Sequence, residues 1–284
     1  MSLSGSATLA GVIGWPVAQS LSPALHGFWL AEYGLDGAYV PLALRPEDFS
    51  RGLDGLFRAG FAGFNVTVPH KEAAFALAAR RDGAAQATGA VNLLVRRDGV
   101  LEGRNTDVYG LTASLRQEWG PDALRGRIAA IWGAGGTTRA AIMALAELGA
   151  AEIRLFNRTP GKAADLAKDF AGKVPATLSA AGYDAWSGKD VALIVHTTTA
   201  GMKQLPSLDL PLDDLPDDAA VFDAVYNPLE TGLLAKARTR GLKTVDGLWM
   251  LLHQAVPSFA AFYGVTPKAG PALRQACLKV LAGG

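Results

Sequence analysis

The chain alternates short apolar runs with longer stretches of helical periodicity, which is the pattern of an α/β protein. In the N-terminal third, the apolar runs predict strands at 8–13, 38–44 and 61–66, and a hairpin of 90–97 and 100–104 turning at Asp98-Gly99. Helical spacing predicts helices at 22–33, 46–59, 71–79 and 107–119. Ser22 is the predicted N-cap of the first helix, with Pro23 at its first helical position.

After residue 127 the alternation becomes regular. The predicted strands are 128–132, 153–156, 191–195 and 221–224, and the predicted helices are 137–148, 161–170 and 233–240. Strands that alternate with helices predict a parallel, doubly wound sheet of the Rossmann type. The C-terminal segment is expected to be helical, and the uncharged run 247–267 has the apolar spacing of a half-buried amphipathic helix rather than a membrane span.

Composition then excludes several classes of protein. Half of the 284 residues are hydrophobic and 19% are charged, which is too apolar for a disordered chain and enough for about two domains. The 27 Lys and Arg against 26 Asp and Glu leave a net charge of +1, so we expect no nucleic-acid partner and no acidic membrane surface as a partner. The 33 glycines and 15 prolines indicate many tight turns.

The cysteine and histidine content limits redox and metal chemistry. The single cysteine, Cys277, excludes an intrachain disulfide framework, a cysteine-rich zinc site and an iron–sulfur cluster. The 4 histidines are scattered, so we expect no metal site. The uncharged segment 1–31 is interrupted by glycine and proline and has no basic start, so it is not expected to be an export signal. A reducing cytoplasm fits these features best.

A glycine-rich turn, Gly133-Ala134-Gly135-Gly136-Thr137, lies between the predicted strand 128–132 and the helix that follows it. Glycines at such a turn let the backbone approach a pyrophosphate, whose charge then faces the free N–H groups of the helix. The usual third glycine of the dinucleotide pattern would fall at Thr138, so a purely structural turn is the alternative. The position between a strand and a helix favours a dinucleotide.

The turn after the next strand is basic: Asn157-Arg158-Thr159, with Lys162 one turn later. An NAD site usually has an acid here, which binds the ribose 2′-hydroxyl, whereas a guanidinium and an ammonium suit the 2′-phosphate of NADP. Taken alone, a solvated basic turn would also explain these residues. Together with the glycine-rich turn they predict an NADP site.

Polar residues also follow predicted elements of the N-terminal half. Ser20 and Ser22 can hold a carboxylate at the start of a helix, or Ser22 can simply cap that helix. Lys71 can stabilise a developing alkoxide or exchange a proton with a hydroxyl, while Asn65 and Thr67 can bind neighbouring hydroxyls. Alone, Lys71 would more often be an exposed residue at a helix start.

A further polar cluster joins Asn92 to Asn105-Thr106-Asp107. Asp107 is either a functional carboxylate or the acidic residue at the N-terminus of its own helix, where the helix dipole favours it. The residues alone leave both readings open.

In their order along the chain, these motifs resemble the shikimate dehydrogenase family, and the resemblance covers nearly the whole length. The matching motifs are Gly14-Trp15-Pro16, Ser20-Leu21-Ser22-Pro23 with His26, 65–71, Gly89-Ala90-Val91-Asn92, Asn105-Thr106-Asp107, 133–136, Asn157-Arg158-Thr159, Ala200-Gly201-Met202, Tyr226-Asn227-Pro228-Leu229, Gly247-Leu248-Trp249-Met250-Leu251 and Gln254.

The resemblance implies a two-lobed α/β fold. An α/β substrate-binding catalytic domain of residues 1–107, completed by C-terminal helices in 248–284, would accompany a Rossmann-type doubly wound NADP-binding domain of 108–247. The implied reaction is the NADPH-dependent, reversible reduction of 3-dehydroshikimate to shikimate, in the pathway to aromatic amino acids. The protein would act as a monomer or a homodimer.

The resemblance also implies roles for individual residues. Lys71 and Asp107 would be the catalytic pair, and Ser20 and Ser22 would hold the substrate carboxylate. The implied contacts to the substrate's hydroxyls or ring are Asn65, Thr67, Asn92, Tyr226 and Gln254. The implied cofactor-binding residues are Gly133, Ala134, Gly135, Gly136, Thr137, Asn157, Arg158, Thr159 and Lys162, with Ala224 and Gly247 near the nicotinamide.

Four positions depart from the family's usual residues: Gln19 replaces His, Leu93 replaces Thr, Val108 replaces Gly, and His196 replaces Asn. The first three belong to the implied substrate side, so they bear on which ring substituents are accepted. Alternatives are a paralogue acting on quinate or an aminoshikimate analogue, a non-catalytic paralogue that senses cofactor or metabolite, and another two-lobed NADP enzyme such as methylenetetrahydrofolate dehydrogenase.

Overall fold

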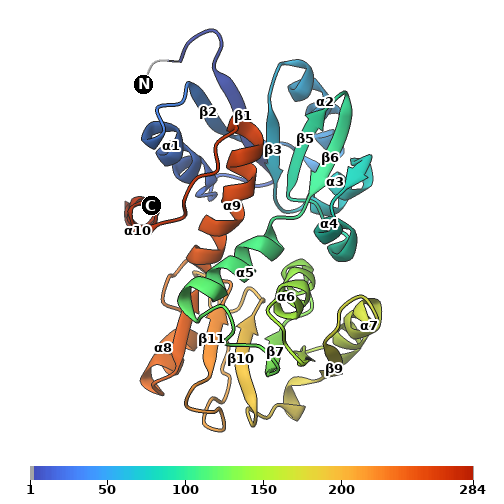
Figure 1. Cartoon of the computed structure of the whole chain (residues 1–284), viewed down its shortest axis with the longest axis vertical. Helices are drawn as coiled ribbons and strands as arrows, with labels where there is room; N and C mark the ends of the chain where they lie inside the picture. The colour runs from blue at the N-terminus through green and yellow to red at the C-terminus, as the bar shows by residue number, and fades with distance from the viewer. Residues whose placement is uncertain (1–2, 284) are drawn as a thin grey trace. The chain divides into compact units, whose positions relative to one another are not determined.

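The computed structural model describes residues 3–283, which form two compact α/β units (Figure 1). Residues 1, 2 and 284, at the outer ends of the predicted substrate domain, lie outside the described residues. Unit 1 comprises the chain up to Thr106 together with the chain from Gln254 onward, and unit 2 comprises Asp107–His253. The chain therefore returns from unit 2 to unit 1 between His253 and Gln254, inside one helix, α9 (Gly247–Tyr263).

Unit 1 contains a six-stranded mixed sheet in the order β2-β1-β3-β5-β6-β4. β1 pairs in parallel with β2 and β3, whereas β5 pairs antiparallel with β3 and β6, so the predicted strands and hairpin are confirmed. The strands are β1 (Thr8–Gly14), β2 (Gly37–Ala43), β3 (Gly63–Val66), β4 (Arg80–Arg81), β5 (Leu93–Arg97) and β6 (Val100–Arg104).

Successive side chains of these strands point to opposite faces of the sheet, because side chains alternate along a strand. Val12 and Leu93 pack with Phe262 of α9 on one face, and Ile13 and Leu94 pack against the helices of the other face. One face of the sheet is therefore covered by the C-terminal segment of the chain. The helices are α1 (Ser22–Glu32), α2 (Phe49–Arg58), α3 (Lys71–Leu77), α4 (Gly83–Thr88), the end of α9, and α10 (Pro271–Gly283), with a 3-10 turn at Pro46–Asp48.

Unit 2 contains a six-stranded sheet in the order β12-β11-β10-β7-β8-β9, in which every pairing is parallel. Numbered from β7, this is the 3-2-1-4-5-6 order of a Rossmann fold, which confirms the predicted doubly wound sheet. The strands are β7 (Ile128–Trp132), β8 (Glu152–Phe156), β9 (Thr177–Ala181), β10 (Val191–His196), β11 (Ala220–Asp223) and β12 (Lys243–Asp246). The helices are α5 (Asp107–Glu118), α6 (Gly136–Glu147), α7 (Pro160–Phe170), α8 (Gly232–Thr239) and the start of α9, with a 3-10 turn at Tyr183–Ala185.

The sequence pattern did not predict β9 and β12, the two edge strands of unit 2. β9 is mostly exposed, and β12 has the sequence Lys-Thr-Val-Asp, so neither contains an apolar run. Edge strands pair on one side only and need fewer apolar residues. The short elements β4 and α4 were missed as well, because each is too short to show a period.

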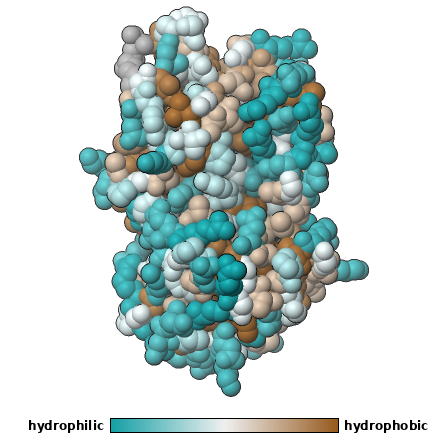
Figure 2. Space-filling model, viewed as in Figure 1, coloured by the Kyte–Doolittle hydropathy of each residue, from teal (hydrophilic) through white to brown (hydrophobic). Residues whose placement is uncertain are grey.

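Figure 2 shows one face of the molecule, on which apolar residues form small, separated groups among hydrophilic ones. No helix of residues 3–283 combines the length and the apolar character needed to cross a membrane.

His26 of α1 is a fully buried histidine whose two ring nitrogens have no hydrogen-bond partner among the described residues. Its ring stacks on Tyr39 with the centroids 3.9 Å apart. Burial lowers the pKa of His26 from 6.5 to about 3, because the charged ring would lose its hydration. The folded protein therefore keeps this ring neutral at pH values where the unfolded chain protonates it.

We predict that His26 makes unit 1 less stable in acid. Its contribution is constant above its unfolded pKa of 6.5, and the free energy of unfolding falls by about 1.4 kcal/mol per pH unit as the pH drops from there toward the folded pKa of about 3. Between roughly pH 6.5 and 5, the wild type should lose about 2 kcal/mol more stability than His26→Phe, which keeps an aromatic ring and removes the titration. Urea unfolding at each pH measures this difference, and equal pH slopes for the two proteins would contradict it.

Candidate active site

The turn before α1 brings Ser20 and Ser22 together. The helix begins at Ser22 with Leu21 as the N-cap and without a side-chain cap, so the predicted N-cap role of Ser22 is wrong. The Ser22 N–H instead donates to Ser20 Oγ at 3.3 Å. The Ser22 hydroxyl is mostly buried and hydrogen-bonds Tyr39, whose pKa burial raises well above its usual value. Two hydroxyls thus lie at the start of a helix, where an anion is favoured.

The side-chain amide of Asn65, in β3, connects three other segments of unit 1. Its Nδ2 donates to the Asn92 carbonyl at 3.0 Å and to Ser258 Oγ at 2.8 Å. Its Oδ1 accepts from the Tyr39 hydroxyl at 2.8 Å. Because Asn65 is buried and both amide hydrogens are used within the protein, its main contribution is to position these neighbours.

Lys71 is the first residue of α3, and the backbone around it is fixed. Its carbonyl accepts the Val91 N–H at 3.0 Å, and the Thr67 N–H donates to the Ile13 carbonyl at 2.9 Å. The preceding His70 is buried, with Nε2 2.8 Å from the Leu44 carbonyl oxygen. The lysine therefore follows a rigid turn at the end of a buried strand, as its position in the sequence predicted.

Asn92 hydrogen-bonds Thr106, the last residue of the first segment of unit 1. Its Oδ1 accepts from the Thr106 N–H at 2.8 Å and lies 3.2 Å from the Thr106 hydroxyl, which also lies 3.2 Å from Gln254 Oε1. Three of the predicted site residues, Asn65, Asn92 and Gln254, are thus linked within unit 1. Asp107 follows Thr106 directly and is the first residue of α5.

In unit 2 the glycine-rich turn joins β7 to α6. Gly133 has φ of +134°, and a Cβ there would overlap Thr197 Oγ1, so only glycine fits. A Cβ on Gly135 or Gly136 would meet no atom within 4 Å, so the backbone of these residues faces open space. α6 begins at Gly136, and the first turn of a helix presents N–H groups without helical partners. The turn fits a pyrophosphate group.

The basic turn after β8 stands beside the glycine-rich turn, because β7 and β8 are adjacent parallel strands. The Gly133 N–H donates to the Phe156 carbonyl, and Asn157 Nδ2 donates to the Thr159 carbonyl at 2.9 Å, which orders the basic turn. Arg158, Thr159 and Lys162 are exposed. Two exposed cations beside a helix N-terminus suit a phosphate of the cofactor.

The ends of β11 and β12 bring Ala224 and Gly247 into contact. A Cβ on Gly247 would overlap the Ala224 carbonyl oxygen, so a larger residue would displace that backbone. Tyr226 lies on the same loop as Ala224, and burial raises the pKa of its hydroxyl. The predicted cofactor residues of unit 2 therefore all follow the carboxyl ends of parallel strands, where open α/β sheets bind ligands.

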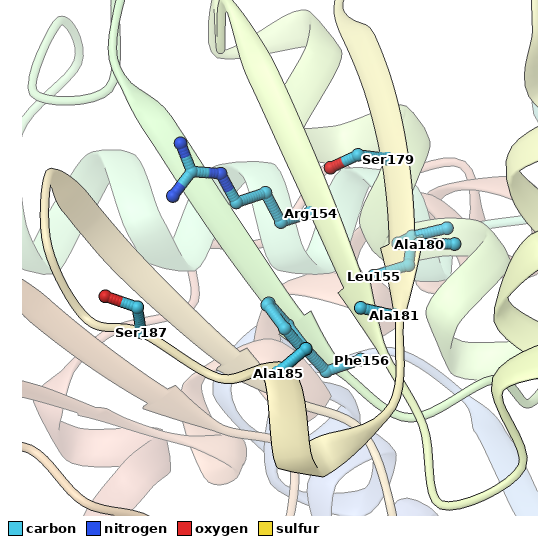
Figure 3. A pocket seen from close by; sticks show the side chains of 8 residues that line it. All are labelled: Arg154, Leu155, Phe156, Ser179, Ala180, Ala181, Ala185 and Ser187. Carbon is cyan, nitrogen blue, oxygen red and sulfur yellow. The ribbon is translucent and has the colours of Figure 1, made fainter.

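A separate pocket of about 270 Å³ lies at β8 and β9 (Figure 3). Its only cationic lining residue, Arg154, is already paired with Glu152 at 2.8 Å, and this hydrogen bond lowers the pKa of Glu152. None of the predicted site residues lines the pocket. Its lining residues are Arg154, Leu155, Phe156, Ser179, Ala180, Ala181, Ala185 and Ser187.

Some residues that support the site were not predicted from the sequence. Tyr39 and Ser258 complete the hydrogen bonds of Asn65, whereas Thr106, which bonds Asn92, already belonged to the polar cluster expected from the sequence. Ser258 lies four residues after Gln254 in α9 and so on the same helix face, a spacing that was available as a signal. In the part of the chain that the structure describes, no three His, Cys, Asp or Glu side chains are grouped to hold a metal ion.

A Rossmann-type unit with a glycine-rich first turn, together with a second α/β unit that holds a buried polar network, defines the class of two-unit dinucleotide-dependent dehydrogenases. Residues 12–94 match the family model described as the shikimate dehydrogenase substrate binding domain. The chain is 52% identical to the NADP(+) shikimate dehydrogenase of Paramagnetospirillum magneticum (strain ATCC 700264 / AMB-1), over 96% of this chain and 98% of that protein.

Solved structures agree with this result. A shikimate dehydrogenase in complex with NADP+ has a TM-score of 0.89 and 34% identity, covering 99% of this chain and 98% of that one. The shikimate 5-dehydrogenase of Thermus thermophilus, in complex with NADP(H) and shikimate, has a TM-score of 0.85 and 36% identity, covering 96% and 99%. The chain belongs to the shikimate dehydrogenase family. The methylenetetrahydrofolate dehydrogenase alternative is thereby set aside.

Proposed function

We propose that this protein catalyses the reversible, NADPH-dependent reduction of 3-dehydroshikimate to shikimate. The observation that carries the proposal is the combination, on one chain, of the polar network around Asn65 and Asn92 with the glycine-rich turn and the exposed cations of unit 2. When bound, the cofactor supplies a hydride to the C3 carbonyl of the substrate. The other groups that the reaction needs come from the side chains and the backbone of the protein.

Lys71 and Asp107 are the proposed catalytic pair. As the carbonyl oxygen gains negative charge, the Lys71 ammonium stabilises it and delivers the proton that makes the hydroxyl. Asp107 hydrogen-bonds the same hydroxyl and orients it. In the reverse direction the amine of Lys71 accepts that proton. The fixed backbone at Thr67 and Val91 keeps the lysine in position, so little reorganisation is needed during the reaction.

The substrate is held by hydroxyl and amide groups. Ser20 and Ser22 bind the carboxylate at the start of α1, and Thr67, Asn92 and Gln254 bind ring hydroxyls. Tyr226 contacts the substrate from the loop after β11. Asn65 acts on the substrate through Asn92, whose carbonyl it holds at 3.0 Å. In this assignment Asn65 is a positioning residue.

The NADP-binding residues follow the ends of the strands of unit 2. Residues Gly133 to Thr137 bind the pyrophosphate, and Asn157, Arg158, Thr159 and Lys162 bind the adenosine ribose with its 2′-phosphate. Ala224 and Gly247 leave room for the nicotinamide. Unit 1 is then the substrate-binding unit and unit 2 the NADP-binding unit. We propose that the protein is cytoplasmic and acts as a monomer or a homodimer. We propose no nucleic-acid partner.

Replacement of Lys71 tests the proposed chemistry. Lys71→Ala should lower kcat for shikimate oxidation by about 10²- to 10⁴-fold, because the group that handles the proton is lost. The KM for NADP+ should stay within about twofold, because Lys71 does not bind the cofactor. Lys279→Ala, at an exposed lysine of α10, is the matched control and should keep wild-type kinetics. NADPH formation measured by absorbance decides the question, and near wild-type turnover of Lys71→Ala would overturn the catalytic role.

Replacement of Arg158 tests the preference for NADP. Arg158→Gln should raise the KM for NADP+ about 10- to 100-fold, the usual worth of a charge-assisted hydrogen bond. The KM for NAD+, which lacks the 2′-phosphate, should change by less than about threefold. Arg125→Gln, at an exposed arginine paired with Asp122, is the control. Equal changes in the KM for NADP+ and the KM for NAD+ would show that Arg158 does not bind the 2′-phosphate.

A further inference from the structure

A buried histidine–aspartate pair lies at the centre of the cofactor-binding edge of unit 2. His196 ends β10 and Asp223 ends β11, and the two residues are directly opposite in the parallel register of these strands. Both are fully buried, and His196 Nδ1 lies 2.9 Å from Asp223 Oδ1. Asp223 Oδ1 also accepts the Val225 N–H, so it acts as an acceptor here and the Nδ1–H of His196 donates to it. A buried pair of this kind needs further partners to satisfy its remaining polar atoms.

The histidine holds the turn that follows β10. His196 Nε2 lies 2.5 Å from Thr198 Oγ1, which in turn accepts the Ala200 N–H at 3.1 Å. In the tautomer that carries its hydrogen on Nδ1, Nε2 accepts the Thr198 hydroxyl proton, and every polar atom in this chain of bonds has a partner. The turn from Thr197 to Ala200 is therefore tied to the buried pair by a side chain rather than by strand pairing alone.

The aspartate holds the loop that follows β11. Asp223 Oδ1 also accepts the Val225 N–H at 3.0 Å, and Oδ2 accepts the Thr231 hydroxyl at 2.6 Å. The backbones are joined as well, because the Ala224 N–H donates to the His196 carbonyl at 3.0 Å. One buried pair thus fixes both loops that leave the centre of this sheet edge.

Both loops contact glycines of the proposed NADP site. Thr197 Oγ1 lies 2.8 Å from Thr138 Oγ1 of α6 and occupies the space that a Cβ on Gly133 would need. The Ala224 carbonyl likewise occupies the space beside Gly247. A shift of either loop would therefore be transmitted to a glycine against which the cofactor is proposed to bind.

We infer that His196 is a positioning residue for NADP, acting through Thr198 on the turn 197–200. This inference rests on the proposed function for the identity of the ligand. His196 stands where the family usually has Asn, and an asparagine amide reaches as far as Nδ1 but not as far as Nε2. His196→Asn can therefore keep the bond to Asp223 while it removes the bond to Thr198. Thr198→Val removes the same bond from the other side, together with the acceptor of the Ala200 N–H, and preserves the branched shape of the side chain.

A double-mutant cycle tests the inference, with the Kd for NADP+ measured by isothermal titration calorimetry. Each single variant should raise this Kd about tenfold, the worth of one hydrogen bond of about 1.4 kcal/mol. The double variant should bind no more weakly than Thr198→Val alone, because that variant already removes the bond between the two side chains. The KM for shikimate should stay within about twofold in every variant, which distinguishes local positioning from general loss of structure.

The control is Thr239→Val, which removes an exposed threonine hydroxyl at the end of α8 and should leave the Kd within about twofold. Single variants with unchanged Kd, or effects that multiply in the double variant, overturn the inference. A parallel rise in the KM for shikimate overturns it as well, since that result indicates a merely structural role. Because calorimetry does not require turnover, absence of shikimate oxidation by the wild type would refute the proposed function separately.

Discussion

The interaction on which unit 1 depends is the set of hydrogen bonds made by the Asn65 amide. This one side chain joins β3 to Tyr39 of β2, to the Asn92 carbonyl before β5, and to Ser258 of α9. A buried amide that loses such partners costs about 1–3 kcal/mol for each polar group left unsatisfied. The hydrogen bonds of this network are therefore expected to form together. It fixes the segments that carry Lys71, Asn92 and Gln254 relative to one another within unit 1.

In unit 2 a buried histidine–aspartate pair plays the part that the Asn65 amide plays in unit 1. His196 and Asp223 end adjacent parallel strands, and their side chains hold the two loops that leave those strands. Loops are ordinarily the most mobile part of a fold, yet a cofactor must be held at fixed geometry for hydride transfer. Buried polar groups at strand ends supply the required rigidity without closing the sheet edge to a ligand.

The sequence predicted the α/β class and the parallel sheet well, because central strands such as β7 and β10 are buried and read as apolar runs. It also placed Gly133 directly after a buried strand and Lys71 one turn after another, as the structure has them, while their roles stay predictions. It did not predict β9 and β12, whose exposure removes the apolar signal. It assigned capping to Ser22, whereas Ser20 Oγ receives the Ser22 N–H. Tyr39 was missed because its partner Asn65 is distant in the chain and no local pattern encodes that contact, whereas the four-residue spacing from Gln254 could have pointed to Ser258.

If this protein acts on shikimate with NADP, both preferences must appear in its kinetics. The most direct test is to measure kcat/KM for shikimate and for quinate, each with NADP+ and with NAD+, on the same preparation of protein. The kcat/KM for shikimate with NADP+ should exceed that of each of the other three combinations by at least about tenfold, a difference of about 1.4 kcal/mol in transition-state stabilisation. A preference for quinate or for NAD+, or no turnover with any combination, would contradict it.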